Sequence, residues 1–228
     1  MATIYPMIST ISFQDVCYSG RLDHLCFEVE QGSQTLLVTS RADDNTALYQ
    51  MMAGLVQPLS GMISMFGQHL SEMDAAGLQY MRQTVAIVPA GGGLISNLKL
   101  WENITLPIVY EKGTLSGECT EEAYDYLRKL NYSGNIMALP AHLSLNEKRM
   151  AAFIRGALKR ASLMIYSDCF DMSSDTNRSN FISVIKEYHQ ADTTRTALFI
   201  STSEKIAADI SPDRVIHLHR SASNNLGS

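Results

Sequence analysis

Four short, continuously apolar segments constrain the fold of this 228-residue chain more than any other feature. Runs of three or four apolar residues without polar alternation are typical of strands covered on both faces, as in a parallel α/β sheet. The runs are Leu36–Val38, Val85–Val88, Leu163–Tyr166 and Leu198–Ile200. Helical spacing of apolar residues occurs between them, and it covers Thr46–Leu55, Met150–Leu158 and Asn180–Tyr188. This alternation of strands and helices predicts right-handed βαβ crossovers.

Two further patterns predict an antiparallel flank and a helical insertion. Three segments have the apolar and polar alternation or the turn signals of half-buried strands, namely Ile11–Tyr18, His24–Glu30 and Gly61–Phe66. Residues 98–139 contain no strong strand candidate, so we expect a helical subdomain over about 98–160. The predicted fold is a single α/β domain over 1–228, with a mixed core sheet, an antiparallel β flank and this insertion. The Ser/Asn-rich tail, 221–228, is expected to be disordered.

Composition and charge exclude several classes of protein. Hydrophobic residues make up 46% of the chain and charged residues 18%, which is typical of a globular domain. The net charge of −5 argues against non-specific nucleic-acid binding, which needs a basic surface. No apolar run reaches the roughly 20 residues that span a bilayer, and the N-terminus lacks a signal-peptide pattern. We therefore expect a soluble, cytoplasmic protein that reaches a membrane only through a partner.

The four cysteines are scattered along the chain and form no CxxC pair. They are Cys17, Cys26, Cys119 and Cys169. This arrangement predicts free thiols in a reducing compartment, and neither a disulfide framework nor a zinc site.

Three segments, in order along the chain, resemble the ATP-binding-cassette (ABC) ATPase family. Gly54–Gly67 is similar to the segment after the family's phosphate-binding helix, Ala86–Ile104 to its Q-loop and the next helix, and Asp213–Leu218 to its last core strand. Each match is weak alone, so their order and distances carry the resemblance; the alternative is an unrelated α/β domain that matches by chance. The resemblance implies a P-loop NTPase-like ABC ATPase fold.

The phosphate-binding loop of that family, GxxxxGK[ST], aligns with Thr39–Thr46, whose sequence is TSRADDNT. Every glycine is missing, Asn45 replaces the lysine, and only Thr46 keeps a hydroxyl that could reach magnesium. Asp43 and Asp44 put carboxylates where a triphosphate would lie, and each like-charge contact at about 4 Å costs about 4 kcal/mol at an effective dielectric of about 20. We predict that Asp43, Asp44 or Asn45 caps the following helix in place of phosphate.

The family's signature loop, LSGGQ, aligns with Leu143–Glu147, whose sequence is LSLNE. Ser144 is retained, both glycines are lost, and the glutamine has become Glu147. Ser-x-x-Glu before an apolar helix predicts a capping box. We favour this interpretation over phosphate recognition because Glu147 adds negative charge to the loop.

The acidic strand end of the family supplies a magnesium aspartate and a general-base glutamate. Counting from the signature places Ser167 and Asp168 at these positions, and a shift of one residue places Asp168 and Cys169 there. Either alignment leaves one carboxylate where two are needed. Asp168 alone is more typical of a hydrogen-bonding residue at a strand end than of a catalyst.

Three more positions complete the aligned site. The Q-loop glutamine is replaced by Ala90 and the switch histidine by Ser203. Tyr18 stands where the family stacks an aromatic ring on adenine, and plain packing is an equal alternative for an isolated tyrosine at a strand end.

These losses affect the groups that handle phosphate, metal and proton transfer, whereas the fold pattern persists. The resemblance therefore implies a non-catalytic, pseudo-ATPase subunit at the cytoplasmic face of a membrane, with neither cofactor nor metal predicted. We expect it to pair with an active cassette or with itself, and to contact a permease through about 90–110. Residues 94–107 look most like bacterial cassettes of lipid-trafficking and export systems. Two alternatives remain: an unorthodox ATPase that uses Tyr18, Thr46, Ser144 and Asp168, and a soluble regulator or scaffold.

Overall fold

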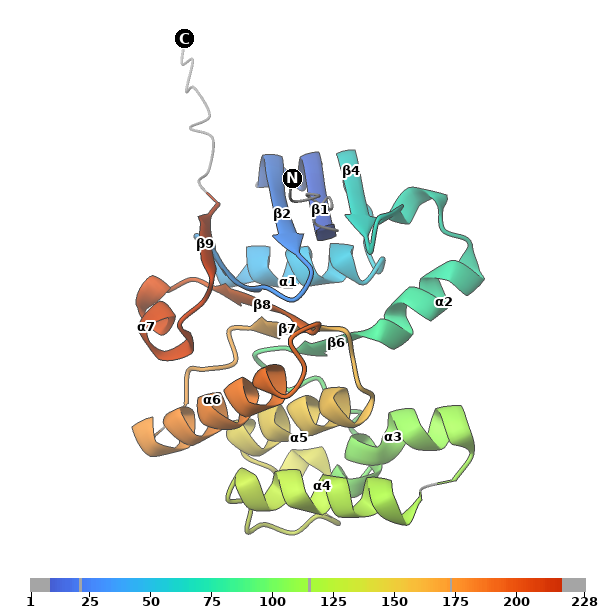
Figure 1. Ribbon diagram of the computed structural model, residues 1–228, viewed down its shortest axis with the longest axis vertical. Helices are drawn as coiled ribbons and strands as arrows, with labels where there is room; N and C mark the ends of the chain where they lie inside the picture. The colour runs from blue at the N-terminus through green and yellow to red at the C-terminus, as the bar shows by residue number, and fades with distance from the viewer. Residues whose placement is uncertain (1–8, 21, 115, 173, 219–228) are drawn as a thin grey trace, which may run out of the picture.

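The strands form two sheets with a helix between them (Figure 1), in a computed structural model that describes residues 9–20, 22–114, 116–172 and 174–218. The core sheet has the strand order β6-β7-β8-β3-β9, and its described pairs are all parallel. Its strands are β3 (Gln34–Val38), β6 (Val85–Val88), β7 (Leu163–Ser167), β8 (Thr196–Ser201) and β9 (Arg214–His217). The four continuously apolar segments all lie in this sheet. The prediction of a mixed core sheet is therefore wrong: the core sheet is parallel, and within the described residues the antiparallel strands pair only among themselves.

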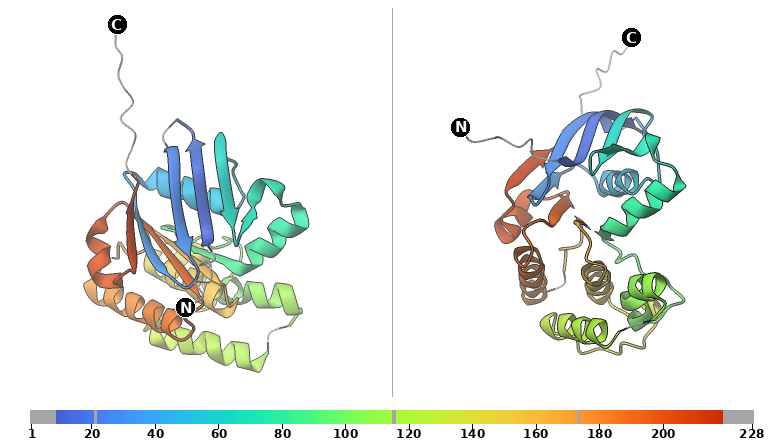
Figure 2. Two further views of the ribbon diagram at one scale, coloured as in Figure 1. Left: turned by 45° about the horizontal axis from the view of Figure 1, so that its top comes forward. Right: turned by 45° about the vertical axis from the view of Figure 1, so that its right-hand side comes forward.

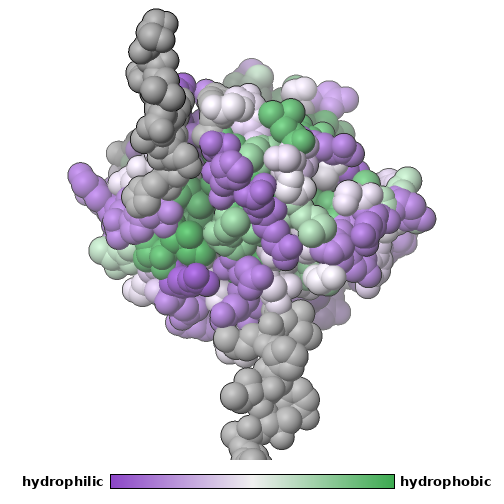
Figure 3. Space-filling model, turned by 90° about the horizontal axis from the view of Figure 1, so that it is seen from above, coloured by the Kyte–Doolittle hydropathy of each residue, from purple (hydrophilic) through white to green (hydrophobic). Residues whose placement is uncertain are grey.

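The antiparallel strands form a second sheet with the order β2-β1-β4-β5, seen side by side in the left view of Figure 2. Its strands are β1 (Ser9–Tyr18), β2 (Leu22–Glu30), β4 (Ser60–Met65) and the unpredicted β5 (Gln68–His69). Figure 3 looks onto the end of the molecule that carries this sheet, and the visible apolar surface there is broken into small groups among polar residues. The sheet therefore buries its inner face and exposes a mixed outer one.

Helix α1 (Ala42–Met52) occupies the space between the two sheets (Figure 1). Leu48 and Met51 are fully buried in one hydrophobic cluster with Phe13 of β1 and Leu37 and Ile165 of the core sheet. Since both sheets pack on this helix, the position of its N-terminal end relative to the core strands is tightly fixed.

A layer of helices covers the opposite face of the core sheet, as the right view of Figure 2 shows. It contains α3 (Leu100–Lys112), α4 (Gly117–Lys129), α5 (Leu145–Leu158) and α6 (Asp175–Gln190). Phe153 lies at its centre and contacts three aromatic rings edge-on, those of Tyr126, Phe181 and Tyr188. The described residues between β6 and β7 form helices and no strand, as the pattern of 98–139 predicts.

The smaller elements carry weaker sequence signals and were not predicted. They are α2 (Ala75–Thr84), α7 (Ala207–Ile210) and three 3-10 segments, Leu70–Glu72, Pro140–His142 and Glu204–Ile206. Within the described ranges, none of the helices has the length and apolar character that crossing a membrane requires. The tail that was expected to be disordered, 221–228, lies outside the described residues.

Candidate functional site

Three loops meet where the central parallel strands end. The backbone N–H of Thr39, after β3, donates to the Ser201 carbonyl at 3.0 Å, and the N–H of Asp168, after β7, donates to the Ile200 carbonyl at 3.0 Å. Ligands of open α/β sheets bind outside the carboxyl ends of the strands. The loop that aligns with the phosphate-binding loop therefore lies beside the strand end that should carry catalytic carboxylates.

A chain of hydrogen bonds between side chains crosses this point. The Thr39 hydroxyl donates to the side-chain oxygen of Asn45. The side-chain NH2 group of Asn45 in turn donates to one oxygen of the Asp168 carboxylate, Oδ2, at 2.5 Å. The other Asp168 oxygen accepts from the backbone N–H of Thr202 at 3.3 Å. Asn45 is only 1% exposed, so its amide is desolvated and held by these partners. Asn45, which aligns with the family's lysine, thus donates a hydrogen bond to the Asp168 carboxylate.

Helix α1 begins at Ala42, inside the segment that aligns with the phosphate-binding loop. Its N-cap is Arg41, in an extended conformation and without a side-chain capping bond. The prediction that Asp43, Asp44 or Asn45 caps the helix is therefore wrong, because all three residues lie in its first turn. Without glycine the segment adopts ordinary helical dihedrals earlier than expected. The two carboxylates remain at the positive end of the helix dipole, where negative charge is stabilising.

Asp168 directs its carboxylate toward α1 from a left-handed backbone conformation, with φ of 45°. Aspartate tolerates this region better than most residues. Its neighbours offer no second carboxylate: Ser167 is buried at the end of β7, and Cys169 is fully buried. Burial raises the pKa of the Cys169 thiol well above its ordinary value, so the thiol stays protonated and cannot act as a general base in the shifted alignment.

Arg149 is a buried cation at the site that sequence analysis missed. It lies in α5 and is 3% exposed. Its Nε donates to the Ala90 carbonyl at 2.7 Å, and its Nη1 donates to the Asp171 carbonyl. The available signal was an arginine next to the apolar face of a predicted helix, a place where an unpaired charge is costly. Arg149 ties the aligned Q-loop to the helical layer through backbone acceptors, so Ala90 takes part with its carbonyl.

A cavity of about 640 Å³ opens beside the Asn45–Asp168 contact. It brings together three of the predicted positions, Ala90, Asp168 and Ser203. Its charged lining residues are three cations and three carboxylates: Arg149, Arg178, Lys205, Asp168, Asp171 and Asp209. One of these pairs is an ion pair, Arg178 with Asp209 at 3.6 Å. The side chains that line this cavity therefore carry no net formal charge.

The remaining predicted residues have local roles. Ser144 is the N-cap of α5. The Ser144 backbone N–H donates to the Glu147 carboxylate at 2.7 Å, and the Glu147 backbone N–H donates to the Ser144 hydroxyl at 3.3 Å. These two bonds confirm the predicted capping box. Ser203 caps a 3-10 turn through the N–H of Lys205. Tyr18 ends β1 and packs against the cluster between the sheets, and Thr46 is half-buried in α1. Of Ser144, Ser203, Tyr18 and Thr46, only Ser203 lines the 640 Å³ cavity.

Comparison with known sequences identifies the family. The family model described as "ABC transporter" matches residues 22–170, which is more than half of the chain, so the chain belongs to the ABC transporter family. The macrolide export ATP-binding/permease protein MacB of Hyphomonas neptunium is 24% identical over 188 residues, covering 82% of this chain and 29% of that protein. The lipoprotein-releasing system ATP-binding protein LolD of Buchnera aphidicola is 23% identical over 167 residues, covering 73% of each. The chain thus spans less than a third of the MacB relative and about three quarters of the LolD relative.

Solved structures confirm the predicted ABC ATPase fold. The ATP-binding cassette MJ0796, in a dimeric post-hydrolysis state with ADP and Pi, superposes with a TM-score of 0.78 over 91% of this chain and 94% of its own, at 16% identity. A bacterial Atm1-family ABC exporter with ATP bound has a TM-score of 0.75 at 18% identity, over 96% of this chain and 38% of that one. At these identities the likeness establishes the fold.

Proposed function

We propose that the chain is a non-hydrolysing ABC subunit that couples or scaffolds a membrane permease and a second cassette. The observation that carries this proposal is the hydrogen bond from Asn45 to Asp168. In an active site, a cation at the position of Asn45 would neutralise phosphate charge, and a carboxylate at the position of Asp168 would bind a metal ion or accept a proton. Here the two side chains satisfy each other, so the site is stable without nucleotide and holds one catalytic carboxylate where two are needed.

The permease contact is proposed on the helical side of the molecule. Ile95, Val109 and Tyr110, within the expected segment 90–110, are large apolar side chains with exposed fractions of 43%, 41% and 77%. A groove of about 240 Å³ lies beside this segment, between the end of α1, β6, α3 and α5, and it includes Pro107. Exposed apolar residues next to a groove are what a helix of a partner would cover. We infer that the insertion over about 98–160 is the helical subdomain and presents this surface.

The relatives' names supply the transporter class for the proposal. They describe macrolide export, ergothioneine transport and lipoprotein release. We propose a role in a transporter of this type, with the chain held at the cytoplasmic face by its permease. Co-purification with a membrane-spanning partner supports this role, whereas isolation with partners that lack membrane spans favours the soluble regulator.

Calorimetric titration with magnesium-ATP, together with a thermal-shift assay, tests the absence of a working nucleotide site. We expect neither heat nor shift from the natural chain. The informative variant is Asp43→Gly/Asp44→Gly/Asn45→Lys, which removes both carboxylates and restores the second glycine and the lysine of the phosphate-binding motif before Thr46, and it should gain a shift. At ligand about a hundred times its dissociation constant, binding adds about 2.7 kcal/mol of stability.

The matched control changes net charge by the same +3 away from the site. It neutralises three exposed acids of the helical layer, Glu111, Glu118 and Glu121, by substitution with glutamine. This control should not respond to magnesium-ATP. A clear shift of the natural chain that equals the shift of the restored variant contradicts the proposal.

The size of the cavity beside Asp168 favours one second candidate, an unorthodox ATPase, although the lining has no net charge and includes only Asp168 of the four residues that this candidate uses. Its volume, about 640 Å³, is in the range of small-molecule sites. This candidate uses Tyr18, Thr46, Ser144 and Asp168, and it predicts magnesium-dependent hydrolysis that Asp168→Asn abolishes. Turnover no higher than that of Asp168→Asn eliminates it.

A further inference from the structure

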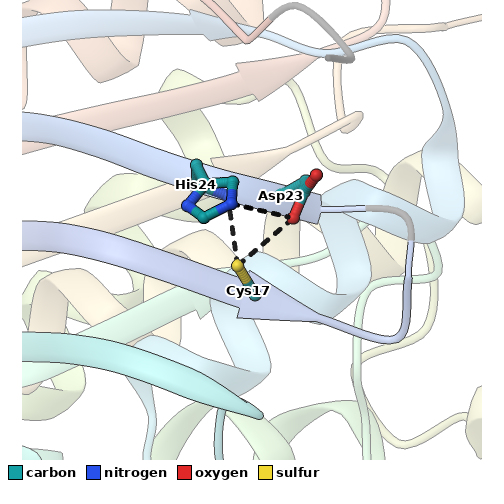
Figure 4. A group of neighbouring side chains, drawn as sticks. All are labelled: Cys17, Asp23 and His24. Atoms are coloured by element: carbon teal, nitrogen blue, oxygen red, sulfur yellow. Dashed lines mark hydrogen bonds and ion pairs between the residues drawn. The ribbon is translucent and has the colours of Figure 1, made fainter. Parts of the chain in front are cut away.

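The turn between β1 and β2 brings together three side chains that commonly bind transition metals, Cys17, Asp23 and His24 (Figure 4). The Cys17 thiol donates to the Asp23 carboxylate at 3.3 Å, and the His24 Nε2 lies 3.8 Å from the same carboxylate oxygen. One ligand atom from each of the three residues lies within 4.8 Å of the other two. These residues lie on the antiparallel sheet and take no part in the site at the strand ends.

The spacing of these atoms fits a small tetrahedral ion. Zinc is bound at about 2.3 Å by sulfur and about 2.0–2.2 Å by nitrogen or oxygen, and tetrahedral angles then separate the ligand atoms by about 3.3–3.6 Å. The two measured separations, 3.3 and 3.8 Å, lie at or next to this range. Small rotations of exposed side chains are enough to complete the geometry.

The backbone of both strands is irregular at this place. In β2, Asp23 and His24 are both exposed between the buried Leu22 and Leu25, so the two-residue alternation of a strand is broken. His24 has φ of 50° and Asp15, on the facing strand, has φ of 55°, and the strand register shifts on either side of Val16. Non-glycine residues rarely adopt this conformation, and it turns adjacent side chains toward one face.

Asp15 contacts the nitrogen of His24 that faces away from Asp23. Its carboxylate lies 2.6 Å from His24 Nδ1, which leaves Nε2 on the side of Asp23. A carboxylate on the far nitrogen of a ligating histidine fixes the ring orientation and the tautomer, and it is the usual outer-shell partner in zinc sites.

We propose that Cys17, Asp23 and His24 bind a zinc-class divalent cation, with Asp15 positioning His24 and water as the fourth ligand. A thiolate with an imidazole selects zinc, cobalt or nickel over magnesium and calcium, which prefer oxygen ligands. Binding forms the metal–sulfur bond and releases the thiol proton to solvent. The scattered cysteines predicted no zinc site, whereas this set needs only one cysteine, which the pairing of β1 with β2 places beside Asp23 and His24.

Cobalt(II) is the probe, because its thiolate charge-transfer and tetrahedral absorption bands report the ligands directly. Titration of the reduced, full-length protein should give one cobalt per chain with a thiolate band, and added zinc should displace it. Cys17→Ser should lose the band, and His24→Ala and Asp23→Asn should lose the tetrahedral spectrum. Asp15→Asn should weaken zinc binding about 10- to 100-fold, as outer-shell substitutions do.

Cys26→Ser is the matched control. Cys26 is an exposed thiol on β2, and it accepts a hydrogen bond from the Asp15 N–H without belonging to the three-residue set. This variant should keep the cobalt spectrum. Loss of the band in Cys26→Ser to the same extent as in Cys17→Ser, or a cobalt complex without a thiolate band, overturns the proposal. Unchanged thermal unfolding of each metal-free variant shows that lost binding is not lost folding.

Discussion

Helices α1 and α5, whose N-terminal ends lie in the segments that align with the phosphate-binding loop and the signature loop, are stabilised there in different ways. At α5, Ser144 and Glu147 form a capping box within one turn. At α1, the N-cap residue Arg41 makes no side-chain capping bond, and Asn45 of the first turn instead binds Asp168, 123 residues away in the sequence. The N-terminal end of α5 is stabilised by hydrogen bonds within one turn, whereas that of α1 is stabilised by a contact with a residue distant in the sequence.

This difference shows two ways in which the N-terminal end of a helix can be stabilised. A local cap needs only a short motif, so it stabilises α5 in any context that leaves the helix intact. The contact at α1 requires the whole core sheet to place Asp168 beside the helix. We therefore expect substitutions at the two ends to differ in magnitude.

The largest expected effect comes from breaking the tertiary contact. Asn45→Ala removes the shorter of two hydrogen bonds of the buried Thr39 hydroxyl and the partner of one oxygen of the half-buried Asp168 carboxylate, so we expect a loss of about 2–3 kcal/mol in the free energy of unfolding. Urea unfolding followed by circular dichroism measures it. Asn177→Ala, the same change in the exposed first turn of α6, should cost less than about 0.5 kcal/mol. Equal costs for the two variants contradict the structural role of Asn45.

The C-terminal ends of the same two helices meet at Arg82 and add a pH dependence. Arg82 Nε donates to the carbonyl of Ala53, which ends α1, and Lys159, which ends α5, donates to the carbonyls of Arg82 and Val85. Burial, with a smaller contribution from the charge of Arg155, lowers the pKa of Lys159 from 10.5 to about 8.

Because the folded pKa of Lys159 is the lower one, the unfolded chain binds more protons between about pH 8 and 10.5. The stability of the natural chain should therefore rise through this window relative to Lys159→Met, by about 2 kcal/mol once partial exposure is allowed for. Unfolding midpoints at pH 7.5 to 10.5 measure the difference, and groups common to both chains cancel. Parallel pH profiles mean that Lys159 is not desolvated.

The smallest expected effect comes from the local cap. Ser144→Ala removes the hydroxyl that accepts from the Glu147 N–H, and typical capping substitutions cost about 1 kcal/mol. Ser144→Thr keeps the oxygen and should restore most of the loss. A cost for Ser144→Ala larger than that for Asn45→Ala reverses the comparison between the two helix ends.

The same contrast explains what the sequence could predict. Four core strands were predicted because both of their faces are buried, whereas the exposed β9 was expected only from the family resemblance. The capping box was predicted because its residues are three apart. The cap of α1 was mispredicted because the residue types were right for a cap, whereas the backbone continues as helix to Ala42. No local pattern indicates that Asn45 has Asp168 as its partner.

Two other features of the structure could not be predicted from the sequence, for related reasons. Arg149 stands in a helix with an apolar face, and its backbone acceptors at Ala90 and Asp171 are identified only by the fold. The group of Cys17, Asp23 and His24 depends on irregular strand backbones, which break the alternation that strand prediction assumes. Sequence patterns thus predicted the fold class and local caps, and missed the contacts that close over long separations.

The strand order of the core sheet has a consequence for synthesis of the chain. Strand β3 pairs with β8 and β9, which are made after the other described strands of the two sheets. At ordinary translation rates the ribosome needs on the order of ten seconds to produce β8 after β3. Throughout that interval the backbone N–H and C=O groups along both edges of β3 lack their native partners. The core sheet can therefore be completed around β3 only after β8 and β9 have been made.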